Sequence, residues 1–203
     1  MRMVSRIVPF LSVVLLLVAG SALSALNPSE EKSAQKNEHR IRNIVLVHGA
    51  WADGSGWKGV YDILVKDGFN VSMVQEPETS FKEAATKRVL ALQDGPSILV
   101  AHSYGGAVIT EAGNDSSVVG LVYIAAHMPD AGENEADGGK KFPSDRSKSG
   151  AIKKTPDGFT YLDAARFHEL FPADLSDEQA AFMARSQVFN FADNFRAPIN
   201  TAA

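Results

Sequence analysis

The sequence contains no cysteine, which excludes disulfide bonds, thiolate catalysis and cysteine-ligated zinc. It also lacks an excess of basic residues, because 20 lysines and arginines stand against 24 acidic residues, for a net charge of −4. This balance gives no reason to expect nucleic acid or an anionic membrane as a partner. Hydrophobic residues make up 45% and charged residues 22% of the 203 positions, which is usual for a single soluble α/β domain.

The first 24 residues are interpreted as a signal peptide. Arg2 and Arg6 precede an apolar run, Ile7–Ala19, and small residues follow it at the positions that a signal peptidase reads. The alternative is an uncleaved anchor helix, since a span of about 20 apolar residues crosses a bilayer. Cleavage predicts an exported protein, periplasmic or secreted, without stable membrane association. Residues 25–40 are polar and charged, and we expect a disordered leader there.

Residues 97–109 are typical of a short apolar strand, a sharp turn that carries Ser103, and a helix that opens on Gly105 and Gly106. The turn, Ala101-His102-Ser103-Tyr104-Gly105, follows the nucleophile-elbow pattern G-x-S-x-G with alanine in the first glycine position. The alternative is a plain strand–helix junction whose serine caps the helix. No Walker lysine or G-x-G-x-x-G pattern includes these two glycines, and we predict no nucleotide, metal or other cofactor.

A second apolar run, 42–47, ends in the turn His48-Gly49-Ala50-Trp51. A serine hydrolase needs two such loops, because one carries the nucleophile and the other supplies a second backbone N–H for the oxyanion. Together the His-Gly-Ala-Trp and His-Ser-Tyr-Gly-Gly segments resemble the α/β-hydrolase superfamily. Within it they are similar to the small, cofactor-free esterase branch that includes plant methyl-salicylate esterases and hydroxynitrile lyases. The resemblance extends from about residue 41 to about residue 198.

This resemblance implies a role for each residue of the two turns. Ser103 would be the nucleophile, and the backbone amides of Ala50 and Tyr104 would form the oxyanion hole. Trp51 would line the pocket, and the partner would be a small-molecule substrate resembling an ester. His127 directly follows the fourth strand, on the same side of the sheet, and is expected to line the pocket too. The resemblance also implies that the first strand lies between the second and the third. A ligand then binds beyond the carboxyl ends of the first and third strands, where the strand order reverses.

The alternation of strands and helices between residues 41 and 127 predicts a mostly parallel sheet with flanking helices. We expect strands at 44–47, 71–74, 98–100 and 118–124, and helices at about 55–67, 81–92 and 104–113. The apolar positions of the first two helices are expected to face the sheet. These positions are Trp57, Val60, Ile63, Leu64 and Val65 in the first helix, and Ala84, Ala85, Val89 and Leu92 in the second.

The resemblance implies that residues 128–198 form a helical lid over the nucleophile. The first part, 128–158, has no periodicity, and helices are predicted at about 161–171 and 177–187. Ser176 and Gln179 form a capping box at the start of the second. The only β-prone run after Ala125 is 159–162, which is too short and isolated to complete the sheet.

The catalytic base is the difficulty, because in this fold the acid and the histidine follow the serine along the chain. Only His127 and His168 do so. His127 directly follows the fourth strand and is the closer candidate, whereas His168 falls on a lid helix where exposure is expected. The strands whose loops carry the acid and histidine in the family are not found. We therefore expect residues 41–203 (core 41–127, lid 128–198) to be an incomplete α/β-hydrolase fold without its last strands.

Three functions remain open. The first is a serine hydrolase, a carboxylesterase that acts on small esters. The second is a catalytically inactive remnant that at most binds small apolar carbonyl compounds, and the third is a lyase or other cofactor-free carbonyl chemistry on the same scaffold. The strand 118–124 would have an open, apolar and β-branched edge, through which we expect self-association.

Overall fold

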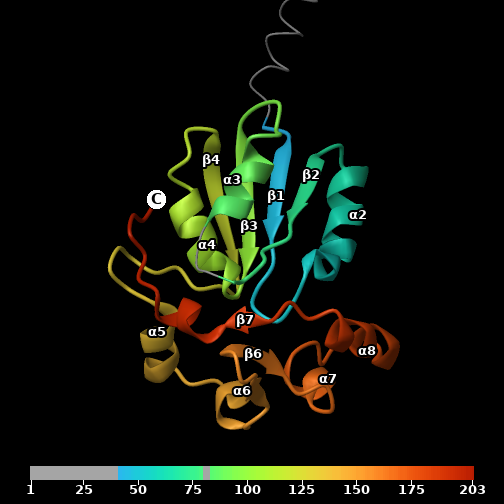
Figure 1. Cartoon of the computed structure of the whole chain (residues 1–203). Coiled ribbons are helices and arrows are strands. Elements are labelled where there is room, and N and C mark those ends of the chain that lie inside the picture. The colour runs from blue at the N-terminus through green and yellow to red at the C-terminus, as the bar shows by residue number, and fades with distance from the viewer. Residues whose placement is uncertain (1–40, 80–82) are drawn as a thin grey trace, which may run out of the picture. The chain divides into compact units, whose positions relative to one another are not determined.

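The computed structural model describes residues 41–79 and 83–203 (Figure 1). The predicted signal peptide and polar leader lie outside the described residues. Within the described part of the chain, no helix combines the length and the apolar character needed to cross a bilayer.

A four-stranded parallel sheet forms the centre of residues 41–203. Its strands are β1 (Asn43–Val47), β2 (Asn70–Val74), β3 (Ser97–His102) and β4 (Val118–Ile124). They lie in the order β2-β1-β3-β4 and every neighbouring pair is parallel, which confirms the predicted strands and their order. All five residues of β1 are buried. This is the arrangement that its apolar run predicts, since a parallel strand covered on both faces needs apolar side chains on both.

The carboxyl ends of β1 and β3 lie side by side, since Val47 pairs with Ala101. The strand order reverses at this point, so the loops after the two strands meet at one edge of the sheet. Figure 1 shows all four strands pointing toward the segments after residue 128. The topology therefore brings the His-Gly turn, the serine turn and the predicted lid to one place.

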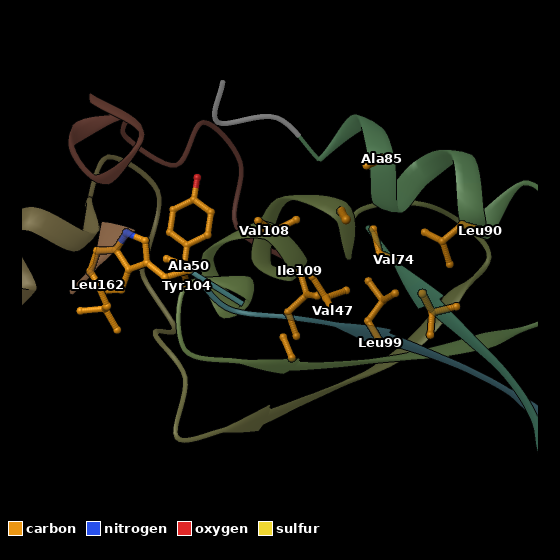
Figure 2. Packing of buried hydrophobic residues seen from close by; sticks show 14 of the residues in the cluster. Val47, Ala50, Val74, Ala85, Leu90, Leu99, Tyr104, Val108, Ile109 and Leu162 are labelled. Atoms are coloured by element: carbon orange, nitrogen blue, oxygen red, sulfur yellow. The ribbon is translucent and has the colours of Figure 1, made fainter. Parts of the chain in front are cut away.

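One face of the sheet is well covered by α3 (Ala84–Leu90) and α4 (Gly105–Ala112). Figure 2 shows Val108 and Ile109 of α4 above Val47 and Leu99 of the strands, and all four are almost fully buried. The predicted inward position of Leu92 is wrong: this side chain is 83% exposed, because α3 ends at Leu90 and the following turn leaves the helical face.

The other face is covered only in part, by the 3₁₀ turn η1 (Gly54–Trp57) and by α2 (Lys58–Lys66). Trp57 is buried there with Ile44, Leu46 and Val100, and Leu64 packs against them. The prediction that Val60, Ile63 and Val65 also face the sheet is wrong, because they are 37%, 63% and 42% exposed. The apolar residues of α2 are spread around most of its circumference, so one orientation of the helix cannot turn all of them toward the sheet.

Toward β4 this second face is open. Val119, Val122 and Ile124 are 52%, 43% and 43% exposed. Among the described residues no strand pairs with the outer edge of β4, which ends the sheet. The expected open, apolar edge is therefore present in this structure.

The lid differs from the predicted pair of helices. It contains α5 (Glu135–Lys141), α6 (Asp145–Lys148), α7 (Phe167–Leu170), α8 (Asp177–Arg185) and η2 (Ala192–Arg196). It also contains a three-stranded antiparallel sheet, β5 (Ile152–Lys154), β6 (Phe159–Leu162) and β7 (Asn190–Phe191). The predicted helix at 161–171 is wrong over its first half, because residues 159–162 alternate between partly and fully buried, a period of two that suits a strand. The capping box at Ser176 is confirmed.

Candidate active site

The serine turn has the backbone geometry of an elbow. Ser103 sits at φ 53°, between the end of β3 and the start of α4. A non-glycine residue in this left-handed region is held at a cost of order 1–3 kcal/mol, which the surrounding packing must offset. The Ser103 carbonyl accepts hydrogen bonds from the N–H groups of Gly106 (3.0 Å) and His127 (3.1 Å). The N-cap of α4 is Tyr104, and no side chain caps it, so the helix-capping interpretation of Ser103 is wrong.

Two glycines allow the serine turn and the His-Gly turn to touch. A Cβ atom on Gly105 would lie 2.5 Å from the His48 carbonyl oxygen and 2.9 Å from that of Val47. A Cβ on Gly49 would lie 2.8 Å from the Ser103 Cβ. Real Cβ atoms do not approach so closely, so this backbone contact requires glycine at both positions. The small residues of the motif therefore have a steric cause.

The loop after β1 is fixed by the lid. Trp51 is buried and has φ 60°, and its indole Nε1 donates a hydrogen bond of 3.0 Å to Thr160 Oγ1 on β6. The Thr160 hydroxyl in turn donates to the Asn190 carbonyl on β7, at 2.9 Å. Neighbouring Ala50 is also buried, and its amide donates no hydrogen bond to any described residue. The Ala50 N–H group, beside Trp51, is thus available to donate a hydrogen bond to a ligand.

A buried polar cluster lies behind this loop. The His48 Nε2 atom accepts from the Glu76 amide at 3.0 Å, so the proton is on Nδ1, which donates to the Gly49 carbonyl at 3.0 Å. Burial lowers the pKa of His48 and raises the pKa of Glu78 to about 9. Both groups are therefore uncharged at neutral pH, and their 3.7 Å contact is not an ion pair. His48 thus connects the loops after β1 and β2, which is a structural role.

A cavity of about 530 Å³ opens on Ser103. Ala50, Trp51, Ser103 and His127, four of the predicted site residues, all line it. Tyr104 does not: its side chain is buried in the core, where its ring lies 5.4 Å from that of Phe195. Figure 2 shows Tyr104 next to Ala50 and Leu162. Only the backbone of Tyr104, directly after the serine, is placed to act at this site.

Of the four histidines in the described part of the chain, only His127 lines this cavity. Burial, with a smaller contribution from Arg146, lowers the pKa of His127, so its ring is neutral at neutral pH. No hydrogen bond joins the ring to any described residue. His168 is held within the lid by Asp177 Oδ1 (3.0 Å) and the Leu175 carbonyl (2.9 Å). His102 lines a separate cavity of about 150 Å³.

Two further cavity residues were not found by sequence reasoning. Glu135, the first residue of α5, is buried, and Arg146 on α6 is half-buried. The Arg146 guanidinium lies 5.3 Å from the centre of the Trp51 ring. Both residues fall in the stretch without periodicity, and no local signal marks them. Among the described residues, no group of three or more His, Asp or Glu side chains could hold a metal ion.

The fold and this turn define a class of protein: a parallel α/β sheet whose elbow serine opens on a cavity at the carboxyl edge. The chain belongs to the alpha/beta hydrolase family, which matches residues 44–202. Among curated proteins, none matches the chain.

Solved structures of other family members share the fold. The pyrethroid hydrolase from Sphingobium faniae JZ-2 is 20% identical, with 81% of this chain and 74% of that chain covered and a TM-score of 0.65. An extracellular alpha/beta-hydrolase from a Paenibacillus species, which shares structural and functional homology with tobacco salicylic acid binding protein 2, is 24% identical (78% and 70% covered, TM-score 0.57). The methylesterase protein MES16 from Arabidopsis is 17% identical (80% and 72% covered, TM-score 0.61).

Proposed function

We propose that the protein is a serine hydrolase of small carboxylic esters. The observation that carries this proposal is Ser103 at φ 53° on an elbow that opens on the same cavity as Ala50 and His127. The similar solved structures include a pyrethroid hydrolase and a methylesterase, which supports ester cleavage as the reaction class. The apolar side chains of Trp51, Phe142, Ile152 and Phe195 in the cavity wall favour apolar groups next to the ester bond.

In this mechanism the Ser103 hydroxyl attacks the ester carbonyl, and His127 accepts its proton. The backbone N–H groups of Ala50 and Tyr104 stabilise the oxyanion of the tetrahedral intermediate. Its collapse releases the alcohol, which takes the proton from His127, and leaves an acyl group on Ser103. A water molecule then repeats the sequence and releases the acid. Since no described carboxylate orients the His127 ring, we expect slow turnover.

A fluorophosphonate probe tests this proposal, because it labels only an activated serine. We expect the chain to be labelled, Ser103→Ala to lose all labelling, and His127→Gln to react at least about tenfold more slowly. His168→Gln is the matched control, since His168 lies within the lid and should leave the rate unchanged. Labelling that survives Ser103→Ala removes this serine from the mechanism, and an unchanged rate in His127→Gln removes the base.

A second candidate function is binding without turnover. The favouring observation is that no described group hydrogen-bonds the His127 ring. In this alternative the cavity holds a small apolar carbonyl compound. The probe would then leave the chain unlabelled, while such a compound would still change the fluorescence of Trp51.

A further inference from the structure

We propose that Arg146 and Glu135 form a carboxylate-binding subsite in the cavity of Ser103, so that the preferred esters carry a free carboxylate. This inference rests on the proposed function in one respect, namely that the bond cleaved is an ester bond. The subsite itself rests on two polar side chains that line the cavity and have no hydrogen-bond partner among the described residues. The ligand class is therefore a monoester of a dicarboxylic acid.

Arg146 is a cation without an anion. Its guanidinium lies 5.3 Å from the centre of the Trp51 ring and 5.8 Å from that of Phe171. Among the described residues, its side chain makes no hydrogen bond and no ion pair within 4.0 Å, and the carboxyl group that acts on its charge is Glu135. A half-buried guanidinium with five unused donors is costly unless something accepts from it. A guanidinium that lies over aromatic rings keeps its N–H donors, and two of them can hold a carboxylate by parallel hydrogen bonds.

Glu135 is the second, independent observation. It is only 8% exposed and lines the cavity, and its Oε1 atom has no hydrogen-bond partner among the described residues. Burial raises its pKa to about 8, an effect that the Arg146 charge only partly offsets. Glu135 therefore carries a proton at neutral pH, and it can donate that proton to a ligand oxygen.

The charges around Glu135 favour a single bound anion. His127 and Lys140 line the same cavity, and Lys140 is already paired with Asp137 at 2.8 Å. Glu78, whose negative charge would act on Glu135, is itself protonated at neutral pH because burial raises its pKa to about 9. The phenol of Tyr104 is uncharged at neutral pH, and burial raises its pKa further. Arg146 is then the uncompensated charge, and its complement is one carboxylate.

The cavity has room for both ends of such a ligand. Its volume of about 530 Å³ falls within the range of small-molecule sites, about 300–1,000 Å³. Ser103 lines the same cavity as the two polar residues. Phe142, Ile152 and Phe195 also line it and supply apolar surface for a methylene chain. An ester with its carbonyl at Ser103 and its carboxylate at Arg146 therefore has room within this cavity.

A binding experiment tests the subsite without requiring catalysis. In the Ser103→Ala protein, monomethyl adipate should bind at least about tenfold more tightly than methyl hexanoate, which has the same chain length and no carboxylate. Trp51 fluorescence or calorimetry measures the Kd. Arg146→Gln should abolish this preference, whereas Lys148→Gln, an exposed cation on the same helix, should not change it. Equal binding of the two esters, or a preference that survives Arg146→Gln, overturns the subsite.

A pH series tests the part played by Glu135. Binding of monomethyl adipate should weaken as pH rises through about 8, because an ionised Glu135 repels the ligand carboxylate. Glu135→Gln keeps a hydrogen-bond donor and cannot ionise. The variant should therefore bind monomethyl adipate at pH 7 with an affinity similar to that of the parent protein, and its affinity should not fall at higher pH. A decline that persists in Glu135→Gln contradicts its role.

Hydrolysis of the two esters separates this inference from the proposed function. Ser103-dependent hydrolysis with a kcat/KM at least about tenfold higher for monomethyl adipate, lost in Arg146→Gln, supports both. Hydrolysis without a preference overturns the subsite and leaves the esterase. Arg146-dependent binding without hydrolysis supports the subsite and overturns the esterase.

Discussion

Glu78 shows how one residue can couple the stability of this protein to pH. Its side chain is fully buried, its own backbone lies at φ 49°, and its carbonyl accepts hydrogen bonds from the Phe191 amide and the Asn194 side chain of the lid. Desolvation disfavours the ionised form of such a carboxyl. The Glu78 carbonyl therefore joins the loop after β2 to the lid, and the Glu78 side chain is a neutral acid at pH 7.

The free energy of unfolding should consequently fall as pH rises from 5 to 8. The unfolded chain releases the Glu78 proton near its usual pKa of about 4.3, whereas the folded chain keeps it up to about pH 9. The folded state thus binds more protons over this window, and the contribution of Glu78 declines by up to about 1.4 kcal/mol per pH unit.

Glu78→Gln measures this contribution, because the amide is isosteric with the protonated acid. Denaturant unfolding at several pH values should give a shallower slope for Glu78→Gln than for the wild type, with the two closest at pH 5. Glu178→Gln, on the exposed side of α8, is the control and should keep the wild-type slope. Parallel slopes for all three proteins would show that Glu78 ionises freely.

At the scale of elements, the start of α4 meets the end of β1 through backbone alone. The position of Ser103 depends on this contact, because Gly105 lies directly against the carbonyls of Val47 and His48. Any side chain at Gly105 has to move one element away from the other. The elbow is thus a property of two packed elements rather than of the serine.

Gly105→Val should therefore destabilise the fold by about 3 kcal/mol or more, and Gly105→Ala by less but still clearly. Gly59→Val on α2 is the matched control, since a Cβ there meets nothing within 4 Å, and we expect a change within about 0.5 kcal/mol. Thermal and denaturant unfolding measure all three. An unchanged midpoint in Gly105→Ala would falsify the steric account of the elbow.

At the scale of the whole molecule, the most consequential feature is the β4 side of the sheet. Burying a Val or Ile side chain contributes about 1.5–3 kcal/mol relative to leaving it in water, and Val119, Val122 and Ile124 are all substantially exposed. The adjacent strand edge has no partner among the described residues. An unprotected edge of this kind is a template for pairing with another chain.

The 203-residue chain should therefore self-associate. Light scattering with size exclusion should give a mass above that of the monomer, increasing with concentration. Val122→Lys with Ile124→Lys should shift the distribution toward the monomer. Ile63→Lys, which removes an even more exposed apolar side chain from α2, should not. A wild-type chain that stays monomeric at every concentration contradicts this prediction.

Export of the chain remains a proposal, supported by the N-terminal sequence pattern. N-terminal sequencing of the protein from a bacterial culture checks it. A mature form that begins at Ala25 is expected, and a protein that begins at Met1 in the cytosol contradicts it.

The sequence by itself determined the parallel sheet, its strand order through the family resemblance, and the two turns that carry Ser103 and Ala50. The strands and the two turns are local features, since each depends on a run of about ten residues with its own apolar pattern and glycines. The resemblance also placed Ala50, Trp51 and Ser103 together, and the position of His127 after the fourth strand placed it at the same edge. All four line one cavity.

Only the tertiary structure decided what surrounds that serine. Trp51 donates a hydrogen bond to Thr160, 109 positions away, and Asn194 donates one to the Glu78 carbonyl, 116 positions away. Whether a glutamate is buried and neutral or exposed and charged depends on such distant neighbours, which no local pattern encodes. The same reason applies to Arg146 over the Trp51 ring and to the β6 strand, because a short alternating segment becomes a strand only where other strands pair with it.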